Sequence, residues 1–314
     1  MRRACLWGVV VGVQMMAAVN AEAPFSLPDG DRILPSSLEL ERRTQPWCPG
    51  ECAVAVPFVA AYRKGTERLV FVGVHHAFQA NDPTMRAVAA GFAAIHAEVV
   101  ILEGFPTFMG ENPPPLVQEA HRYGAPNAPD FDRGEAMYAA SLALSRGIPF
   151  VGGEPGHPEQ LEVLKAKGFT DAEIAFSSLL GWFSQALRSK DIPDTSAASL
   201  AQIYPRLAEN VKRQWNLEAP TLDEFREHYR HLYGIDIVGD DRFPLRIDIG
   251  DPTRNGQQLR VDMMTRDRHL LGLIEQQLAD RHSVLVVFGG SHWSTLSAAL
   301  EARLGKPKVR AFVK

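Results

Sequence analysis

The chain has 314 residues, of which 46% are hydrophobic and 22% are charged. This composition is ordinary for a globular protein and sufficient for a sizeable core. The formal net charge of −4 at pH 7 gives no reason to expect nucleic-acid binding, which requires a basic surface. No long run of like charges and no low-complexity tract indicates a disordered interaction tail.

The first residues are typical of an export signal. Arg2 and Arg3 precede an apolar stretch over residues 6–19, which is too short to span a bilayer comfortably. Because Ala21 and Ala23 are small residues that suit signal peptidase, we predict a signal peptide over residues 1–23. A retained N-terminal anchor is the alternative. After cleavage, the protein is expected to be periplasmic or secreted and to lack a stable membrane span.

Residues 24–52 are rich in Pro and charge, and this composition predicts an irregular N-terminal arm. Cys48 and Cys52 flank Pro-Gly-Glu at the end of the arm. In an exported protein, such closely spaced cysteines indicate a small disulfide loop. A metal half-site is the alternative, but the sequence has no second cysteine pair that would complete it.

Short apolar runs alternate with helical patterns over residues 53–314. This alternation predicts a single α/β domain with a mixed, largely parallel central sheet, and its first two strands are expected to form a hairpin. Strands are expected at residues 53–62, 69–74, 99–102, 148–151, 283–288 and 309–313. Helices are expected at residues 81–95, 134–145, 257–280 and 291–304. Ser291 is placed to cap the last of these helices.

The pattern between about residues 157 and 245 is helical throughout, which predicts a helical insertion. Its helices are expected at residues 161–167, 171–188, 197–215 and 222–232. The polar stretch 234–256 fits either a lid or a plain surface loop. The Gly- and Pro-rich stretch 103–115 is expected to form a loop that walls a site.

A β-branched apolar run followed by Gly-x-x-His occurs twice, with the glycine and histidine at residues 73–76 and 289–292. Two other strands deliver a carboxylate at their ends, Glu103 and Glu154. In open α/β sheets, ligands bind at the carboxyl ends of the strands. We therefore expect the two histidines and the two carboxylates to converge. The glycines are expected to let the backbone turn sharply and approach a ligand closely.

These residue types match a hydrolytic metal site, which uses about three imidazole or carboxylate ligands and leaves one position for water. We predict that His76, His292 and one or both of Glu103 and Glu154 hold a divalent ion. The ion would lower the pKa of its water, and the spare carboxylate would take the proton. Arg266 is predicted to steady a developing oxyanion or to bind a substrate carboxylate. The sequence leaves open which glutamate is the base.

Each residue also has a structural interpretation. A histidine after a strand is often a packing residue, but the duplicated placement favours a functional role for His76 and His292. Glu103 ends a buried strand, where an unpaired carboxylate is costly, so function is again favoured. Glu154 can equally belong to a plain turn, and Arg266 can simply pair with a neighbouring carboxylate, Asp267, on a helix surface.

Among the other histidines, His75 requires a separate interpretation. It can be a second ligand, a partner that orients a ligand, or a core residue. We favour the last two roles, because neighbouring strand residues point to opposite faces. The remaining histidines are not expected to be ligands; they are His96, His121, His157, His228, His231, His269 and His282.

The motifs together resemble the TraB/PrgY–Tiki–GumN superfamily, which is related to the erythromycin-esterase and ChaN haem-uptake families. The matching residues are the two Gly-x-x-His copies, Glu103 and Arg266, while Glu154 is similar to a second acidic position of some relatives. The matched frame covers roughly residues 68–304. The chain departs from the usual Gly-Thr-x-His by having Val74, and it carries the long helical insertion.

The resemblance implies an α/β fold built from two related halves. It also implies a metal-dependent peptidase using manganese or cobalt if the chain is Tiki-like, an ester hydrolase if it is erythromycin-esterase-like, and haem iron binding if it is ChaN-like. We expect an exported metal-dependent hydrolase that uses manganese, cobalt or zinc on a peptide or a small-molecule ester. Haem or iron binding without catalysis is the alternative, and an inactive relative that serves a partner is a third possibility.

Overall fold

The computed structural model describes residues 47–48, 52–53, 56–77, 79–123, 134–188, 190–240, 243 and 251–312. The predicted signal peptide and most of the arm lie outside these ranges. Two short strands, β1 (Trp47–Cys48) and β2 (Cys52–Ala53), pair antiparallel and place the backbone of Cys48 opposite that of Cys52. The cysteine side chains lie outside the described part, so the disulfide stays a prediction.

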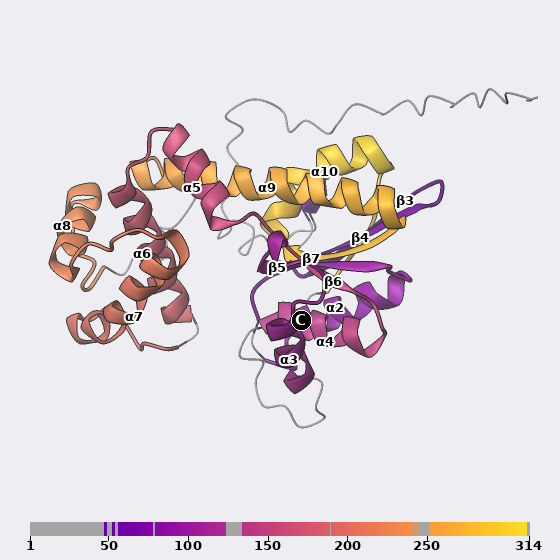
Figure 1. The fold of residues 1–314 in the computed structure, drawn as a ribbon, viewed down its shortest axis with the longest axis horizontal. Coiled ribbons are helices and arrows are strands. Elements are labelled where there is room, and N and C mark those ends of the chain that lie inside the picture. The colour runs from indigo at the N-terminus through magenta and orange to yellow at the C-terminus, as the bar shows by residue number, and fades with distance from the viewer. Residues whose placement is uncertain are drawn as a thin grey trace, which may run out of the picture.

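A six-stranded mixed sheet forms the centre of the molecule, with the strand order β6-β5-β7-β4-β3-β8 (Figure 1). The strands are β3 (Phe58–Lys64), β4 (Glu67–Val74), β5 (Val99–Pro106), β6 (Phe150–Glu154), β7 (Ser283–Gly289) and β8 (Lys308–Ala311). Strands β4, β5, β6 and β7 are parallel, whereas β3 runs antiparallel to both β4 and β8. The predicted mixed, largely parallel sheet and its hairpin are confirmed.

Helices cover both faces of the sheet (Figure 1). One layer consists of α2 (Pro83–Ala94), α3 (Pro114–Tyr123) and α4 (Gly134–Ser145), and the other of α9 (Arg254–Arg281) and α10 (Gly290–Leu304). Strand β4 shows the reason: Val70 and Val72 pack in the first layer, and Leu69 and Phe71 in the second. Successive strand side chains point to opposite faces, so a strand buried on both sides is a continuous apolar run.

The starts of two helices differ in how they are capped. Asp82 accepts a hydrogen bond from the backbone of Thr84 and caps α2, with Pro83 in the first turn as expected. Helix α10 instead begins at Gly290, with Gly289 as its N-cap and no side-chain cap. The expected cap by Ser291 is wrong, because β7 passes directly into the helix and the first turn already contains that residue.

The stretch after Glu103 is more regular than predicted. Strand β5 continues to Pro106, and a 3-10 turn, η1 (Thr107–Met109), follows it. Helix α3 then begins at Pro114, so the expected loop over residues 103–115 is wrong for most of its length. Its prolines lie at the start of the helix, where the missing backbone N–H groups cost no hydrogen bond.

Between β6 and α9, the chain forms the four predicted helices: α5 (His157–Ala166), α6 (Asp171–Arg188), α7 (Ala197–Trp215) and α8 (Leu222–Tyr233). They enclose an apolar core of their own, centred on large side chains such as Phe176, Phe225 and Tyr229. Figure 1 shows α6, α7 and α8 to one side of the sheet and its covering helices. Residues 244–250 lie outside the described ranges, so the choice between a lid and a surface loop stays open.

Helix α9 is 28 residues long and joins the helical insertion to the sheet. Its first part packs against the insertion, where the Nε atom of Arg254 lies 2.8 Å from a carboxylate oxygen of Glu173 and Val261 contacts the apolar core. Its second part lies on the sheet through Leu270 and Ile274. Within the described ranges, no helix, α9 included, is long and apolar enough to cross a membrane.

Candidate functional site

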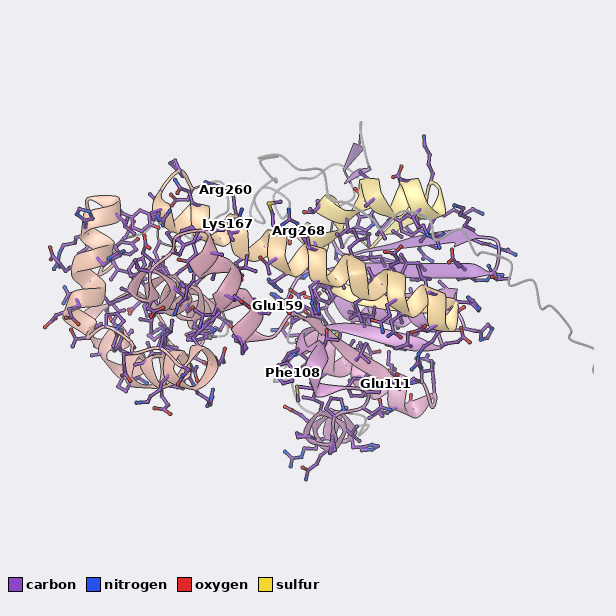
Figure 2. All side chains as sticks on the ribbon, turned by 45° about the horizontal axis from the view of Figure 1, so that its top comes forward. Phe108, Glu111, Glu159, Lys167, Arg260 and Arg268 are labelled. Atoms are coloured by element: carbon purple, nitrogen blue, oxygen red, sulfur yellow. The ribbon has the colours of Figure 1, made fainter. Side chains whose placement is uncertain are left out.

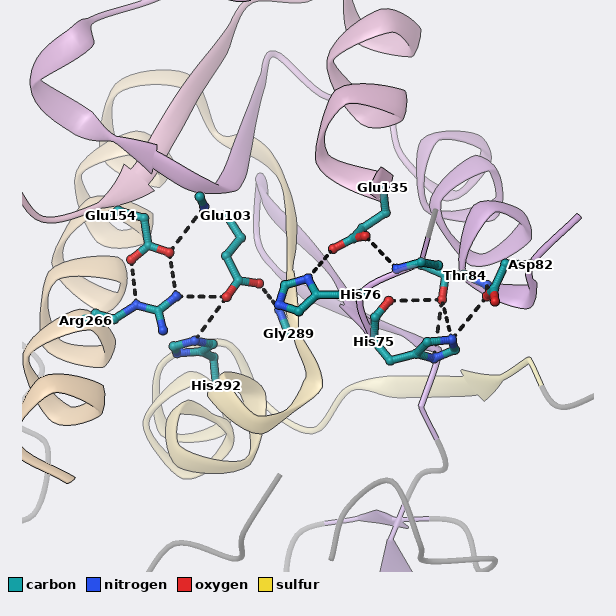
Figure 3. Close-up of polar contacts among 12 residues, drawn as sticks. His75, His76, Asp82, Thr84, Glu103, Glu135, Glu154, Arg266, Gly289 and His292 are labelled. Carbon is teal, nitrogen blue, oxygen red and sulfur yellow. Dashed lines mark hydrogen bonds and ion pairs between the residues drawn. The ribbon is translucent and has the colours of Figure 1, made fainter. Parts of the chain in front are cut away.

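Arg266 connects the two predicted carboxylates at the carboxyl edge of the sheet (Figure 3). Its Nε atom donates to Oε2 of Glu154 at 2.7 Å, and its Nη2 atom donates to Oε1 of Glu154 at 2.6 Å and to Oε1 of Glu103 at 2.8 Å. The strands β5 and β6 are neighbours, and α9 crosses above them. These three predicted site residues therefore form one network, which we call the Arg266 network.

His292 lies in the first turn of α10 and is only 1% exposed. Its Nδ1 atom is 2.6 Å from Oδ1 of Asp267, a carboxylate on α9 that is completely buried. Its other nitrogen, Nε2, lies 3.5 Å from Oε1 of Glu103. The ring therefore joins the Arg266 network with Nε2 facing the glutamate.

His76 approaches Glu103 from the opposite side of the strand edge (Figure 3). Its Nδ1 atom is 2.9 Å from Oε1 of Glu135, and the second oxygen of Glu135 accepts a hydrogen bond from the backbone of Ala77. The His76 side chain is 58% exposed, whereas the Glu135 side chain is 5% exposed. Burial raises the pKa of Glu103, and His76 is one of the neighbouring groups that lower it.

The two Gly-x-x-His copies are adjacent in the sheet but one residue out of step. In the parallel ladder of β4 and β7, Gly73 pairs with Phe288 and Val74 pairs with Gly289. After Gly289 the chain enters α10, whereas the first copy continues without a helix to His76. The two histidines therefore reach Glu103 from different directions.

Sequence reasoning missed two functional side chains, Glu135 and Asp267. Each holds the Nδ1 atom of one candidate histidine and so fixes the direction of its ring, and in His292 this turns Nε2 toward Glu103. Asp267 is enclosed rather than exposed, so the alternative of a surface pair with Arg266 is wrong. The position of Glu135 in the first turn of a helix gave no signal, since 59 residues separate it from His76.

His75 turns away from this centre. Its Nε2 atom lies 3.2 Å from Oδ1 of Asp82 and 3.3 Å from the hydroxyl of Thr84, both at the start of α2. These contacts anchor the segment that carries His76 to the covering helix. His75 therefore lies outside the Arg266 network, and the two roles favoured for it, orienting a ligand or packing in the core, stay predictions.

Both motif glycines permit close approach rather than an unusual backbone angle. A Cβ atom on Gly73 would lie 2.2 Å from the ring of Phe58. Gly289 donates its backbone N–H to Oε2 of Glu103 at 2.7 Å, and a Cβ atom there would be 3.3 Å from the same oxygen. Neither has a positive φ, and Gly73 lies within a regular strand, so the expected sharp turn at this residue is wrong.

Charge pairing keeps both glutamates ionised. Burial raises the pKa of Glu103, but its contact with His292 and the nearby positive charges hold that pKa well below the usual range. Burial also raises the pKa of Glu154, and the charge and hydrogen bonds of Arg266 bring it below the usual range. The guanidinium of Arg266 thus dominates for Glu154, whereas the two histidines contribute more for Glu103.

The carboxylates around His292 favour its protonated ring. Burial and the charge of Arg266 lower its pKa, but Asp267 and Glu103 act in the opposite direction and raise it to about 9. A bound metal ion would favour the neutral ring instead, because a ligating nitrogen cannot carry a proton.

The donors fit a divalent ion in kind: two imidazoles, each oriented by a carboxylate on Nδ1, face one glutamate. The described side chains do not close around an ion as they stand, since no group of three or more His, Cys, Asp or Glu residues among them is arranged to hold one. Glu154 gives both oxygens to Arg266, so Glu103 is the better-placed carboxylate ligand.

Figure 2 shows Phe108 and Glu159 where the helical insertion meets the sheet. Phe108, in η1, is 74% exposed there, and a Cβ atom on Gly156 would lie 3.3 Å from its ring. Thr107 donates to the backbone oxygen of Gly152 and lies 2.7 Å from Nε2 of His269 on α9. These contacts tie the turn after β5 to both β6 and α9.

Comparison with known proteins adds no assignment. No family model matches the chain, and no match was found among curated proteins or among solved structures. The resemblance to the TraB/PrgY–Tiki–GumN superfamily therefore stays a prediction carried by the motifs.

Proposed function

We propose that this chain is a metal-dependent hydrolase that cleaves a peptide or ester bond at the carboxyl edge of the sheet. One observation carries the proposal: His76 and His292 each have Nδ1 held by a carboxylate and approach the same glutamate, Glu103. Such an arrangement fixes the tautomer and direction of an imidazole, as at catalytic metal centres. Purely structural histidines have no need of this duplicated orientation.

The ion would be manganese, cobalt or zinc, held by His76, His292 and Glu103. When bound, it supplies a water of lowered pKa and polarises the substrate carbonyl. Export and cleavage of the predicted signal peptide would place the enzyme in the periplasm or outside the cell.

The residues of the Arg266 network have different roles in the proposed reaction. Glu154 binds Arg266 through both carboxylate oxygens and so fixes the plane of the guanidinium. Within the described residues, Nη1 of Arg266 makes no hydrogen bond, so this end of the group is available to bind the carbonyl oxygen as negative charge develops on it.

Glu103 is the better candidate for the carboxylate ligand, and which of the two glutamates takes the proton of the water is not assigned. Glu103 lies between the two histidines, whereas both oxygens of Glu154 are occupied by the guanidinium. The backbone N–H of Gly289 holds one oxygen of Glu103 and fixes the direction of the other. His76, as the exposed member of the centre, marks the side from which substrate enters.

A hydrolysis assay with matched variants tests the proposal. The full-length protein, supplied in turn with manganese, cobalt and zinc, is expected to hydrolyse members of a panel of peptides and esters. Glu103→Gln is expected to abolish turnover, while Glu98→Gln, at an exposed residue before the same strand, is expected to keep it. Absence of hydrolysis with every ion and every substrate would contradict the proposed function.

A further inference from the structure

Asp262 is an acidic side chain at this centre that has no role in the Arg266 network. It lies on α9 one turn before Arg266, and residues four apart share one face of a helix. Burial raises its pKa, and the charges of Arg266 and Glu154 also act on it, which agrees with this position on the helix. Its neighbour Val261 contacts the insertion core, which places Asp262 on the insertion side of the centre.

One oxygen of the Asp262 carboxylate has no hydrogen-bond partner among the described residues. This atom, Oδ1, is buried. The hydrogen bonds of Arg266 go to Glu154 and Glu103 instead. Burial raises the pKa of Asp262, although the charge of Arg266 opposes this effect. A buried acceptor with no donor is costly, and a ligand that supplies a donor would remove that cost.

The pairing of the carboxylates indicates a positively charged ligand. Four of the five carboxylates at the centre contact a guanidinium or an imidazole: Glu103 and Glu154 contact Arg266, Asp267 contacts His292, and Glu135 contacts His76. Asp262 is the carboxylate that no cationic group binds directly.

An ammonium group fits this position better than a second metal ion. Asp262 offers one carboxylate, whereas a metal ion needs about three protein ligands. An ammonium group needs only acceptors and can donate to a single carboxylate. The Nη1 atom of Arg266, one helical turn away, offers donors to a carbonyl oxygen on the same molecule.

We propose that Asp262 binds the protonated amine of a substrate whose free amino group lies next to the carbonyl group that reacts. The N-terminal residue of a peptide and an amino-acid ester both have this chemistry. The identity of the reacting bond rests on the proposed function, but the binding of the amine does not.

Calorimetric titration with two non-reacting probes tests this inference. The probes are phenylalaninol and N-acetylphenylalaninol, which have no carbonyl group on the carbon that bears the amine, and they are measured on the full-length protein at about pH 6.5, below the usual α-amino pKa of about 8. The free amine is expected to bind at least about tenfold more tightly than the acetylated probe. Asp262→Asn, which is nearly isosteric, is expected to remove that preference. Asp280→Asn, at an exposed position on the same helix, is expected to retain it.

The inference is overturned if the unmodified protein binds both probes equally or binds neither, or if Asp262→Asn keeps the preference. Thermal unfolding of the variant serves as a folding control, and removal of an unpaired buried charge is expected to leave its stability equal or higher. Hydrolysis is measured separately on the same preparations. A protein that shows the amine preference but hydrolyses nothing would contradict only the proposed function.

Discussion

The Nδ1 atom of His292 lies 2.6 Å from Oδ1 of Asp267, and both side chains are almost completely enclosed by protein. This contact joins α10 to α9 and turns the Nε2 atom of His292 toward Glu103. Asp267 thus holds the histidine of the second Gly-x-x-His motif. Its neighbour in the sequence, Arg266, holds the two glutamates. One turn of α9 therefore positions the histidine and both carboxylates.

Replacing Asp267 by Asn is expected to lower metal affinity or catalytic efficiency, while the side chain keeps nearly the same volume. The amide removes the negative charge that holds His292, so metal affinity or kcat/KM is expected to fall about 10- to 100-fold. Metal titration and steady-state kinetics measure the effect, with Asp280→Asn as the matched exposed control. An Asp267→Asn variant that keeps the metal affinity and activity of the unmodified protein would show that this contact does not position the histidine.

Replacing Arg266 by Met is expected to destabilise the fold by about 3–5 kcal/mol, because two buried carboxylates lose their shared cation. Urea unfolding measures this loss. The double variant that adds Glu154→Gln is expected to recover part of it, since one of the unpaired charges is then removed. Equal stability of the single and double variants would argue against the shared-cation arrangement.

Replacing Gly73 by Ala is expected to cost about 1–3 kcal/mol, because the added Cβ atom would lie 2.2 Å from the ring of Phe58. Gly272 on α9 is the matched control: a Cβ atom there would meet nothing within 4 Å, and its φ is not positive. Gly272→Ala is expected to stabilise the protein by about 0.5–1 kcal/mol through the greater helix propensity of Ala. Thermal unfolding of both variants compares them, and a neutral Gly73→Ala would refute the close-approach explanation.

Asp236 in the helical insertion is expected to make stability depend on acid pH. Burial raises its pKa, but hydrogen bonds from Arg226, Val238 and Arg230 lower it to about 2. Because this folded-state pKa is below the unfolded value of about 3.9, the stabilisation is present above pH 4 and lost as the pH falls toward about 2. After allowance for partial exposure, Asp236→Asn is expected to cost about 1 kcal/mol at pH 7 and nothing near pH 2. A stability difference independent of pH would contradict the ionic origin.

The sequence predicted the parts of the fold that depend on local patterns. The apolar runs of β4 and β7 and the start of α2 at Asp82 were identified because strand burial and helix capping leave local signals. Helix α3 was not identified, because three successive prolines obscured its start. The expected cap at Ser291 was wrong, because β7 leads into α10 with no intervening residue.

The candidate site was predictable only at the ends of strands. Glu103 and Glu154 follow β-branched runs, and topology alone brings such ends to one edge. Glu135, Asp262 and Asp267 were missed because they lie on helices, where a buried acid and a solvated one look alike in sequence. Their roles depend on contacts across many residues, 59 in the case of Glu135 with His76.

The alternative function, haem binding without catalysis, would require the same histidines to bind haem iron. A haem titration of the full-length protein is expected to show no Soret shift, because His292 is enclosed and its Nδ1 is held by Asp267. His76→Ala serves as the matched variant, since His76 is the exposed imidazole of the centre. A Soret shift that is lost in this variant would favour the haem-binding alternative over the hydrolase.

The central claim is that His76 and His292 together hold a divalent ion beside Glu103. Equilibrium dialysis against manganese, cobalt and zinc, followed by elemental analysis, measures this most directly. We expect about one ion per chain in the full-length protein and in His96→Ala, which removes an exposed histidine outside the centre. We expect none in His76→Ala or in His292→Asn, whose amide can still donate to Asp267. Failure of the unmodified protein to bind any of the three ions, or unchanged binding in both site variants, would contradict the account.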